Sequence, residues 1–514
     1  MKRFKFIIIF SAVVLVTATS CKKWLDVQPK TKIKSEDLLR TEQGYKDALL
    51  GAYTMMTPEA LYGRELSFGF FDALAKEYDA TSNAYIDLVN GTGNANIYKL
   101  TTVRPRIDQF WGGLYNINAN VNNILGNIDA DSAIFTGSNY SIVKGEALAL
   151  RAFLHLELFK MFALNDSLSL TQPAIPYVKT LSTGVTKTST GNEVLNYVIS
   201  DLKAAASYLQ NDPITRGQKK SADVFLNDRN LRLNYYAVKG LQARAYIWQK
   251  DYVNALAAAQ AVMSAGDQIF PWVNSANLIS SDNKNIDYTF STEHLFALNV
   301  FNLQTISNNW FISALTTGNQ LSRKGHTTSG TSTTNYYEGF FESTATISTG
   351  ATDYRLVRIS DQNIMPADAS SNYYVSKKYY QPTGYNSNYA ARIPLLRRSE
   401  MNYIAAECIL NTQGDYPTAV AYLNEVRRHR GISTDLLSTL APTTLRTEIT
   451  KEYYKEFQGE GQFFFYAKRN RSVPVNFPTS VNSAGTWSYN TFYSSPSTFW
   501  LLPKPDNETE YNPN

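Results

Sequence analysis

The histidines are the first residues to consider for chemistry, and their spacing forms no site. His155, His294, His326 and His429 are widely separated, and none stands at a metal-ligand spacing from a cysteine or a carboxylate. The sequence has no G-x-S-x-G nucleophile elbow and no Walker-type loop, and GTGNAN at 91–96 lacks the third glycine of a dinucleotide fingerprint. We therefore expect no enzyme, no metal and no cofactor.

Three glutamates, Glu146, Glu407 and Glu460, lie in or beside segments with helical patterning. Glycoside hydrolysis needs two carboxylates facing each other across a sugar, and a sequence cannot show that geometry. Carboxylates on helices commonly form ion pairs or cap a terminus. We expect that structural role for all three, and we expect His155 to be packed or solvated within its helix.

The chain has two cysteines, Cys21 and Cys408, so a framework of several disulfides is excluded. Cys21 follows a short basic segment, an apolar run from Phe6 to Val16 and four small residues. This is the layout of a secretory signal, and the run is too short to span a bilayer. The small residue before Cys21 resembles the lipobox of bacterial lipoproteins, although Ala18 stands where that motif usually has leucine. Cys21 is therefore predicted to be acylated; an ordinary secretory signal ending near a cysteine is the alternative.

Residues 1–20 are thus predicted to be a lipoprotein signal peptide, and 21–514 a single domain that contacts the membrane through its lipid anchor only. No later segment has about 18 consecutive apolar residues, so no membrane-spanning helix is expected. The formal net charge of +5 falls when the basic signal segment is removed. Nucleic acid is therefore not expected as a partner.

Aromatic residues make up 13% of the chain, with 34 Tyr and 7 Trp among many Asn, Ser, Thr and Gln. Flat amphipathic rings beside amides and hydroxyls suit a surface that contacts hydroxyl-rich ligands, although a large helical core would also hold many of them. Trp111 and Trp248 fit helical stripes and are assigned to the core. The candidate ligand-binding residues are the loop aromatics with polar neighbours, and one such neighbour: Trp310, Trp272, Tyr336, Tyr337, Tyr78 and Asn83.

These candidate residues must be held in place by a scaffold, and the periodicity of the apolar residues predicts a helical one. Apolar residues recur three or four apart over 42–56, 110–128, 145–162 and 193–209, which predicts amphipathic helices. Two further stretches, 241–266 and 405–431, resemble each other as helix, Asp-Tyr turn and helix. Small alanines three residues after each tyrosine allow close helix packing; the matching pairs are Tyr252 with Ala255 and Tyr416 with Ala419.

The predicted fold is mainly α, with about four degenerate tetratricopeptide-like hairpins forming a right-handed superhelical scaffold. The scaffold is expected over about 36–266 and 395–470. Between them, about 270–395, the chain is rich in Ser, Thr, Asn, Gly and Tyr and has weak helical periodicity. We expect this insert to be loop-rich with few short strands, ordered by its aromatic contacts, and to carry the ligand side.

Several islands together resemble the SusD/RagB family of nutrient-binding outer-membrane lipoproteins of Bacteroidetes. They are CKKWLD, the helix EALALRAFLHLELFKMF with the following QPAIPYV, IPLLRRSEMNYIAAECIL, EITKEYYKEFQGEGQFFFYAKRN and the ending FWLLPKPDNETEYNPN. They occur in the family's order over almost the whole chain. The positions matching the family motifs are Glu146, Arg151, Ala152, Pro176, Arg397, Glu400, Ala406 and Glu407.

The resemblance implies a glycan-binding lipoprotein of a polysaccharide-utilisation system, anchored by acyl chains such as palmitate in the outer membrane and facing the cell exterior. It implies a lid that passes an oligosaccharide, or in some members a peptide, to a SusC-like TonB-dependent transporter. Lys22 and Lys23 replace the acidic residues that favour export to the outer leaflet. The alternative class is a tetratricopeptide-like scaffold lipoprotein for envelope assembly.

Overall fold

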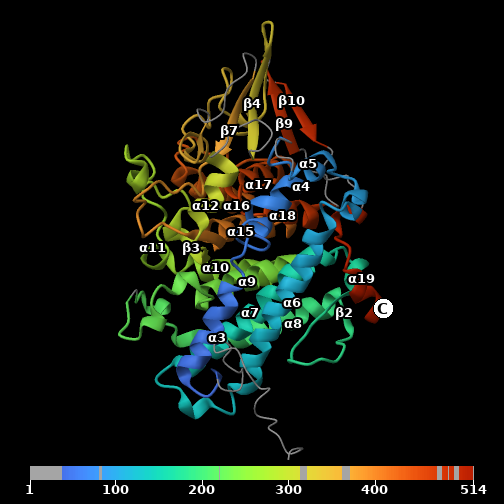
Figure 1. Cartoon of the computed structure of the whole chain (residues 1–514). Coiled ribbons are helices and arrows are strands. Elements are labelled where there is room, and N and C mark those ends of the chain that lie inside the picture. Colours follow the sequence, from blue (N-terminus) through green and yellow to red (C-terminus); the bar gives the residue numbers. More distant parts are fainter. Residues whose placement is uncertain are drawn as a thin grey trace, which may run out of the picture.

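The structure is a computed structural model and describes residues 38–79, 84–218, 220–312, 321–361, 371–471, 477–483, 486–490 and 497–512. Helices fill the lower and middle parts of the molecule in Figure 1, and a sheet stands at the top. The predicted mainly α class is therefore confirmed. The predicted signal peptide, Cys21 and Asn83 lie outside the described residues. In the ranges given above, no helix has both the length and the apolar character needed to cross a membrane.

The helices of the first half pack against one another in chain order. They are α3 (Glu42–Thr54), α6 (Arg104–Asn127), α7 (Asn139–Phe162), α8 (Gly191–Tyr208) and α9 (Tyr235–Gln249). The apolar stripes are buried as predicted; Tyr45 and Leu49 of α3 are fully buried. Helix α6 begins earlier than predicted because a proline is favoured in its first turn, where no helix hydrogen bond is lost. Helix α8 begins with a capping box between Thr190 and Glu193.

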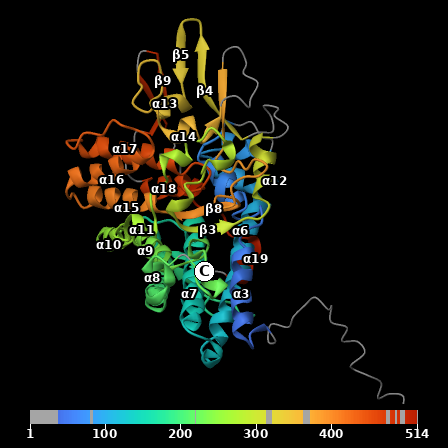
Figure 2. The ribbon, with the colours of Figure 1, turned by 90° about the vertical axis from the view of Figure 1, so that its left-hand side faces the viewer.

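The two similar stretches form helical hairpins, α9 with α10 (Tyr252–Met263) and α15 (Arg398–Asn411) with α16 (Tyr416–His429). Ala255 and Ala419 are fully buried, as expected for helices in close contact. Helix α10 packs directly on α15, although the insert separates them in sequence. Helices α17 (Pro442–Glu456) and α18 (Phe463–Asn470) continue the stack (Figure 2). The handedness of the superhelix stays a prediction.

The insert contributes four strands to a six-stranded sheet in which every pairing is antiparallel, with the order β10-β9-β5-β4-β7-β6. Strands β4 and β5 form a hairpin whose Gly330 has a φ of +60°, a left-handed conformation that suits a tight turn. The strands are β4 (Ser322–Ser329), β5 (Ser332–Asn335), β6 (Ser360–Asp361), β7 (Ser371–Ser376), β9 (Phe477–Asn482) and β10 (Trp487–Asn490). Strands β9 and β10 come from the C-terminal region, which the sequence did not predict to join the insert.

A second antiparallel pair, β3 (His294–Asn299) with β8 (Arg392–Arg397), closes the base of the insert. Its register places His294 opposite Arg397 and Asn299 opposite Arg392, so both ends of the insert leave the helical stack side by side. A third pair joins β1 (Pro173–Pro176) and β2 (Thr188–Thr190). The remaining short α-helices are α4 (Phe70–Leu74), α5 (Ile86–Asn90), α11 (Gly266–Ile269), α12 (Leu303–Ser307), α13 (Tyr337–Phe340), α14 (Tyr354–Val357) and α19 (Asp506–Tyr511).

Candidate functional site

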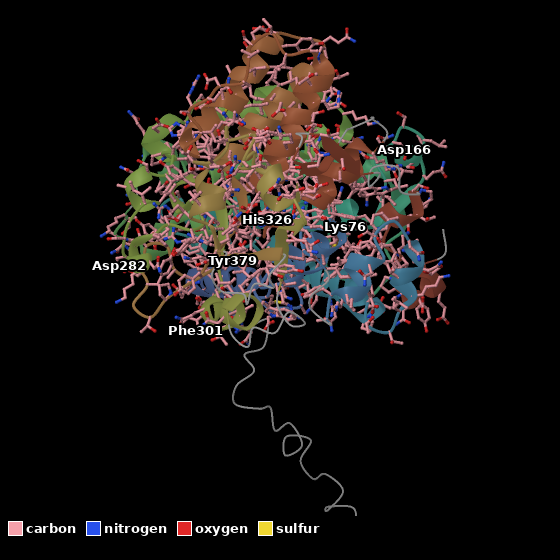
Figure 3. The ribbon with its side chains drawn as sticks, turned by 90° about the horizontal axis from the view of Figure 1, so that it is seen from above. Lys76, Asp166, Asp282, Phe301, His326 and Tyr379 are labelled. Atoms are coloured by element: carbon pink, nitrogen blue, oxygen red, sulfur yellow. The ribbon has the colours of Figure 1, made fainter. Side chains whose placement is uncertain are left out.

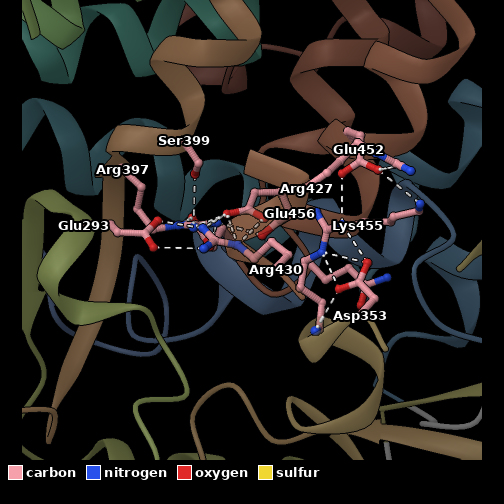
Figure 4. Close-up of polar contacts among 12 residues, drawn as sticks. Glu293, Asp353, Arg397, Ser399, Arg427, Arg430, Glu452, Lys455 and Glu456 are labelled. Atoms are coloured by element: carbon pink, nitrogen blue, oxygen red, sulfur yellow. Dashed lines mark hydrogen bonds and ion pairs between the residues drawn. The ribbon is translucent and has the colours of Figure 1, made fainter. Parts of the chain in front are cut away.

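A buried cluster of charges joins the insert to the helical stack (Figure 4). We call it the charged junction, and each of its side chains is at most 3% exposed. Arg430, at the end of α16, donates to both oxygens of Glu293 at 2.9 and 2.6 Å and to Glu456 of α17 at 2.6 Å. Its members are Glu293, Asp353, Arg355, Arg397, Arg427, Arg430, Glu452, Lys455 and Glu456.

Glu456 receives hydrogen bonds from three arginines of the charged junction. Arg397 donates to Oε1 at 2.5 Å, and Arg355 donates to Oε2 at 3.1 Å. Burial alone would raise the pKa of Glu456, but the charges of Arg430 and Arg397 outweigh burial and hold that pKa well below its ordinary value. Glu456 is therefore an ionised, saturated carboxylate, not a proton donor or acceptor for chemistry.

The same structural role holds for the three glutamates singled out in the sequence. Glu146 pairs with Arg229, Glu407 pairs with Arg469, and Glu460 pairs with Arg397 and Lys378. The prediction of ion pairs is confirmed at all three positions. Glu400, another of the family-matching positions, likewise accepts from Arg244 at 2.9 and 2.6 Å.

His155 is packed in α7, one of the two alternatives expected for it. Its Nε2 accepts a hydrogen bond from the backbone N–H of Val178 at 3.0 Å, and its Nδ1 lies 2.8 Å from the carbonyl oxygen of Arg151. Burial lowers the pKa of His155 to about 4, so the ring is neutral near pH 7. Across the described part of the chain, no group of three His, Cys, Asp or Glu side chains is arranged to hold a metal ion.

A half-buried indole, Trp310, packs on the buried ring of Tyr85 where the first helices meet the segment after β3. We call this surface the Trp310 face and define it by Arg64, Tyr85, Arg106 and Trp310. The ring centroids of Trp310 and Tyr85 are 5.3 Å apart at an interplanar angle of 68°. The Arg64 guanidinium lies 4.8 Å from the Trp310 ring, and that of Arg106 lies 4.9 Å from the Tyr85 ring.

Ion pairs and a hydrogen bond hold the Arg64 and Tyr85 side chains of the Trp310 face in place. Arg64 pairs with Glu59 at 2.5 Å and with Glu65 at 2.9 Å, and the Tyr85 hydroxyl donates to Glu65 at 3.1 Å. The side chains of Arg64 and Arg106 each keep 21% of their surface exposed. A partly exposed indole with the Arg64 guanidinium beside it can stack on the apolar face of a sugar, while the guanidinium donates to the sugar hydroxyls.

Tyr78 and Tyr337 meet in a small polar cavity near the Trp310 face. Its volume is about 20 Å³, and Glu77 and Arg323 also line it. The Tyr78 hydroxyl donates to the Phe68 carbonyl oxygen at 2.8 Å. The Phe68 ring lies 5.2 Å from that of Phe311, the residue after Trp310. Three of the sequence candidates, Tyr78, Tyr337 and Trp310, are thus brought into one neighbourhood, but Tyr78 and Tyr337 themselves are buried.

Tyr336 and Trp272 are placed differently. Tyr336 is half-buried, with the Lys324 ammonium 5.9 Å from its ring. Trp272 lies apart, against α16: its ring stacks on His429 at 4.7 Å, and its Nε1–H donates to Glu425 at 3.2 Å. Trp272 is 8% exposed. Trp111 and Trp248 are buried in the core, as predicted.

Sequence reasoning missed Arg64, Tyr85, Arg106 and Phe301. The Phe301 side chain is 97% exposed in the turn between β3 and α12, and Figure 3 shows it at the rim of the molecule. It stands between Val300 and Asn302, so the criterion of a loop aromatic with a polar neighbour would have found it. Arg64 and Arg106 carried no signal, because their contacts with the rings come from distant parts of the chain.

Two family profiles match the chain in succession. The profile described as "Starch-binding associating with outer membrane" matches residues 23–227, and the SusD family profile matches residues 279–514. The chain belongs to the SusD/RagB family. The two matched ranges leave out residues 228–278, which contain α9, α10 and α11, and the range of the SusD profile includes the charged junction.

Similar proteins agree with this membership. SusD-like protein P25 of Formosa agariphila is 23% identical over 260 residues, 50% of this chain and 46% of that protein, so the match spans about half the length of that curated relative. A solved putative sugar binding protein of Bacteroides vulgatus has a TM-score of 0.63 at 20% identity, covering 92% of this chain and 97% of that one. A SusD-like carbohydrate binding protein of the same species has a TM-score of 0.62 at 17% identity, covering 92% and 96%. At these identities the solved structures establish the fold alone.

Proposed function

We propose that this SusD/RagB protein binds an oligosaccharide at the Trp310 face and delivers it to a SusC-like TonB-dependent outer-membrane transporter. The observation that carries the proposal is a half-buried indole held in place by Tyr85 and Arg64. Stacking on a sugar needs a ring that is fixed before the ligand arrives, because ordering a free side chain would reduce affinity. The matching family profile is described as starch-binding, and two solved relatives are described as carbohydrate- and sugar-binding proteins, which supports this ligand class.

Binding, not catalysis, is the proposed activity. The buried carboxylates of Glu400, Glu407 and Glu460 are each paired with an arginine inside the fold. Of the sequence candidates, Trp310 and Tyr336 keep exposed surface and are proposed as direct ligand contacts. Tyr78 and Tyr337 are proposed to support the surface from beneath.

The test is a panel of purified polysaccharides screened by intrinsic tryptophan fluorescence, with hits measured by calorimetry. Trp310→Ala is expected to weaken binding of the hit by about tenfold, which is the contribution to affinity of one aromatic ring stacked on a sugar. Calorimetry is the readout for the variant, because the substitution removes a fluorophore. Tyr511→Ala removes an exposed ring on α19, beside β2 in Figure 1, and serves as the matched control. An affinity of Trp310→Ala equal to that of wild type would sink the assignment.

The outcome of the panel also separates the alternatives. If this protein co-purifies with a large outer-membrane barrel but binds no glycan, the result would favour the peptide-binding class of the family. If it neither co-purifies with a barrel nor binds a glycan, the result would favour a scaffold lipoprotein for envelope assembly.

Tethering through Cys21 is part of the same proposal. Two or three acyl chains would hold the domain firmly at the outer membrane, because each buried CH₂ contributes about 0.8 kcal/mol. We expect Cys21→Ala to move the protein from the membrane fraction to the soluble fraction. An unchanged membrane fraction would contradict lipid anchoring at this residue.

A further inference from the structure

A second cavity, separate from the Trp310 face, opens between the helical stack and the insert. Its volume is about 400 Å³, within the range of about 300–1,000 Å³ typical of small-molecule sites. Helix α11 and the segments that precede β3 and β8 contribute its walls. None of the sequence candidates lines it.

His294 gives this cavity a buried acceptor. The residue is fully buried, and its Nε2 lies 2.8 Å from the carbonyl oxygen of Thr289. A carbonyl oxygen only accepts, so Nε2 carries the hydrogen and Nδ1 is a bare acceptor. Nδ1 has no hydrogen-bond partner among the described residues, and neither does the buried hydroxyl of Thr292 in the same wall. An unpaired buried acceptor destabilises the fold, so a ligand hydroxyl that donates to Nδ1 would remove that cost.

The two arginines of the cavity wall differ in their partners. Arg229 pairs with Glu146 and with Asp212, so its charge is neutralised within the fold. Arg392, the first residue of β8, is half-buried and forms no ion pair with any carboxylate of the described ranges. Burial lowers the pKa of Arg392, because its charge is partly removed from water. The carboxylates of Asp287 and Asp228 lie near Arg392 and act against this lowering of its pKa, but neither forms an ion pair with it, so Arg392 can still donate to a ligand anion.

The rest of the wall suits a sugar ring. Phe270 and Tyr389 offer aromatic surface, whereas Asn230, Gln268 and Asn388 offer amides. Asp228, which is exposed, adds a carboxylate that can accept from hydroxyls. This mixture of rings, amides and one unpaired cation differs from the Trp310 face, where both arginines lie over rings.

We propose that this cavity is a binding site for an acidic sugar of one or two rings, with the ligand carboxylate on Arg392 and ligand hydroxyls on His294 and Thr292. The proposal does not depend on glycan binding at the Trp310 face. The two sites would take different ligands, an oligosaccharide on the Trp310 face and a short acidic sugar in the cavity.

The test uses two monosaccharides that differ only at C6, D-galacturonate and D-galactose, with calorimetry or ligand-observed NMR on the whole mature protein. Galacturonate is expected to bind at least about tenfold more tightly than galactose, the value of a charge-assisted contact. Arg392→Gln is expected to remove this preference, and Thr292→Val is expected to weaken both ligands. Arg358→Gln, which removes an exposed arginine outside the cavity, is the charge-matched control.

Three results would overturn the proposal: equal binding of the two sugars to wild type, no binding of galacturonate to folded protein, or an unchanged preference in Arg392→Gln. Trp310→Ala separates this site from the proposed function. It is expected to leave galacturonate binding unchanged while weakening the polysaccharide hit, and the reverse pattern would place the acidic sugar on the Trp310 face.

Discussion

The charged junction and the Trp310 face both use arginines against other side chains, but they differ in what is left open. In the charged junction, Arg430 and Glu456 are fully buried and bond each other and further partners. At the Trp310 face, Arg64 also forms ion pairs, yet it and the indole keep exposed surface. Saturated buried charges hold two parts of a fold together, whereas partly exposed ones beside a ring are available for recognition.

The largest expected effect is at the charged junction. Arg430→Ala leaves Glu293 and Glu456 buried with fewer partners, so we expect it to lower the free energy of unfolding by about 3–5 kcal/mol. Chemical denaturation measures this change. The neighbouring Arg428→Ala breaks only an exposed pair with Asp435, and it is expected to cost less than about 1 kcal/mol. Equal losses in the two variants would remove the distinction between buried and exposed pairs.

A smaller effect is expected from pH, through Glu342, which pairs with Lys451 of α17 and so joins the insert to the helical stack. Burial would raise the pKa of Glu342, but Lys455 and Lys451 outweigh it and lower the pKa to about 2. A lowered folded-state pKa stabilises above the unfolded value of 4.5, and this contribution is lost as pH falls from 4.5 towards 2. The loss amounts to about 3 kcal/mol.

Denaturation of wild type and Glu342→Gln between pH 7 and pH 2 measures this contribution, because only the wild type should show the extra slope below pH 4.5. The variant is expected to be less stable at pH 7 and to converge on the wild type at low pH. Parallel profiles would show that the Glu342 carboxylate does not stabilise the fold.

The smallest effect on stability is expected at the Trp310 face. Trp310→Ala removes one edge-on contact with Tyr85 and one cation–π contact with Arg64, which together contribute about 1–2 kcal/mol. The same variant is expected to lose ligand affinity. A loss of stability as large as that of Arg430→Ala would mean that the indole belongs to the core rather than to a binding surface.

Local patterns were enough to predict the helices. The spacing of apolar residues such as Tyr45, Leu49 and Ala52 indicates the buried face of a single helix and needs no knowledge of distant partners. The similarity of the two helical hairpins that contain Tyr252 and Tyr416 could likewise be predicted from the sequence. The six-stranded sheet was not, since β5 and β9 pair across more than a hundred residues and strand propensity depends on such partners.

The partners in the candidate sites were hidden for the same reason. Arg430 and Glu293 are 137 residues apart in sequence, and nothing in either segment indicates the other. The residue types of Trp310 and Tyr78 suggested a loop surface, but only the fold distinguishes the half-buried indole from the buried phenol. Arg392 and His294 carried no sequence signal, because an unpaired group is recognised only once its surroundings are known.

The contact between α10 and α15 has a consequence for how the chain folds. One face of α10 stays uncovered until the polypeptide has been made well beyond Met263 and α15, which begins at Arg398, can reach it. Such a long closure raises the contact order, and proteins of high contact order fold slowly. Completion of the helical stack is therefore a late, C-terminus-dependent event, and chains truncated within the insert would expose an apolar helical surface prone to aggregation.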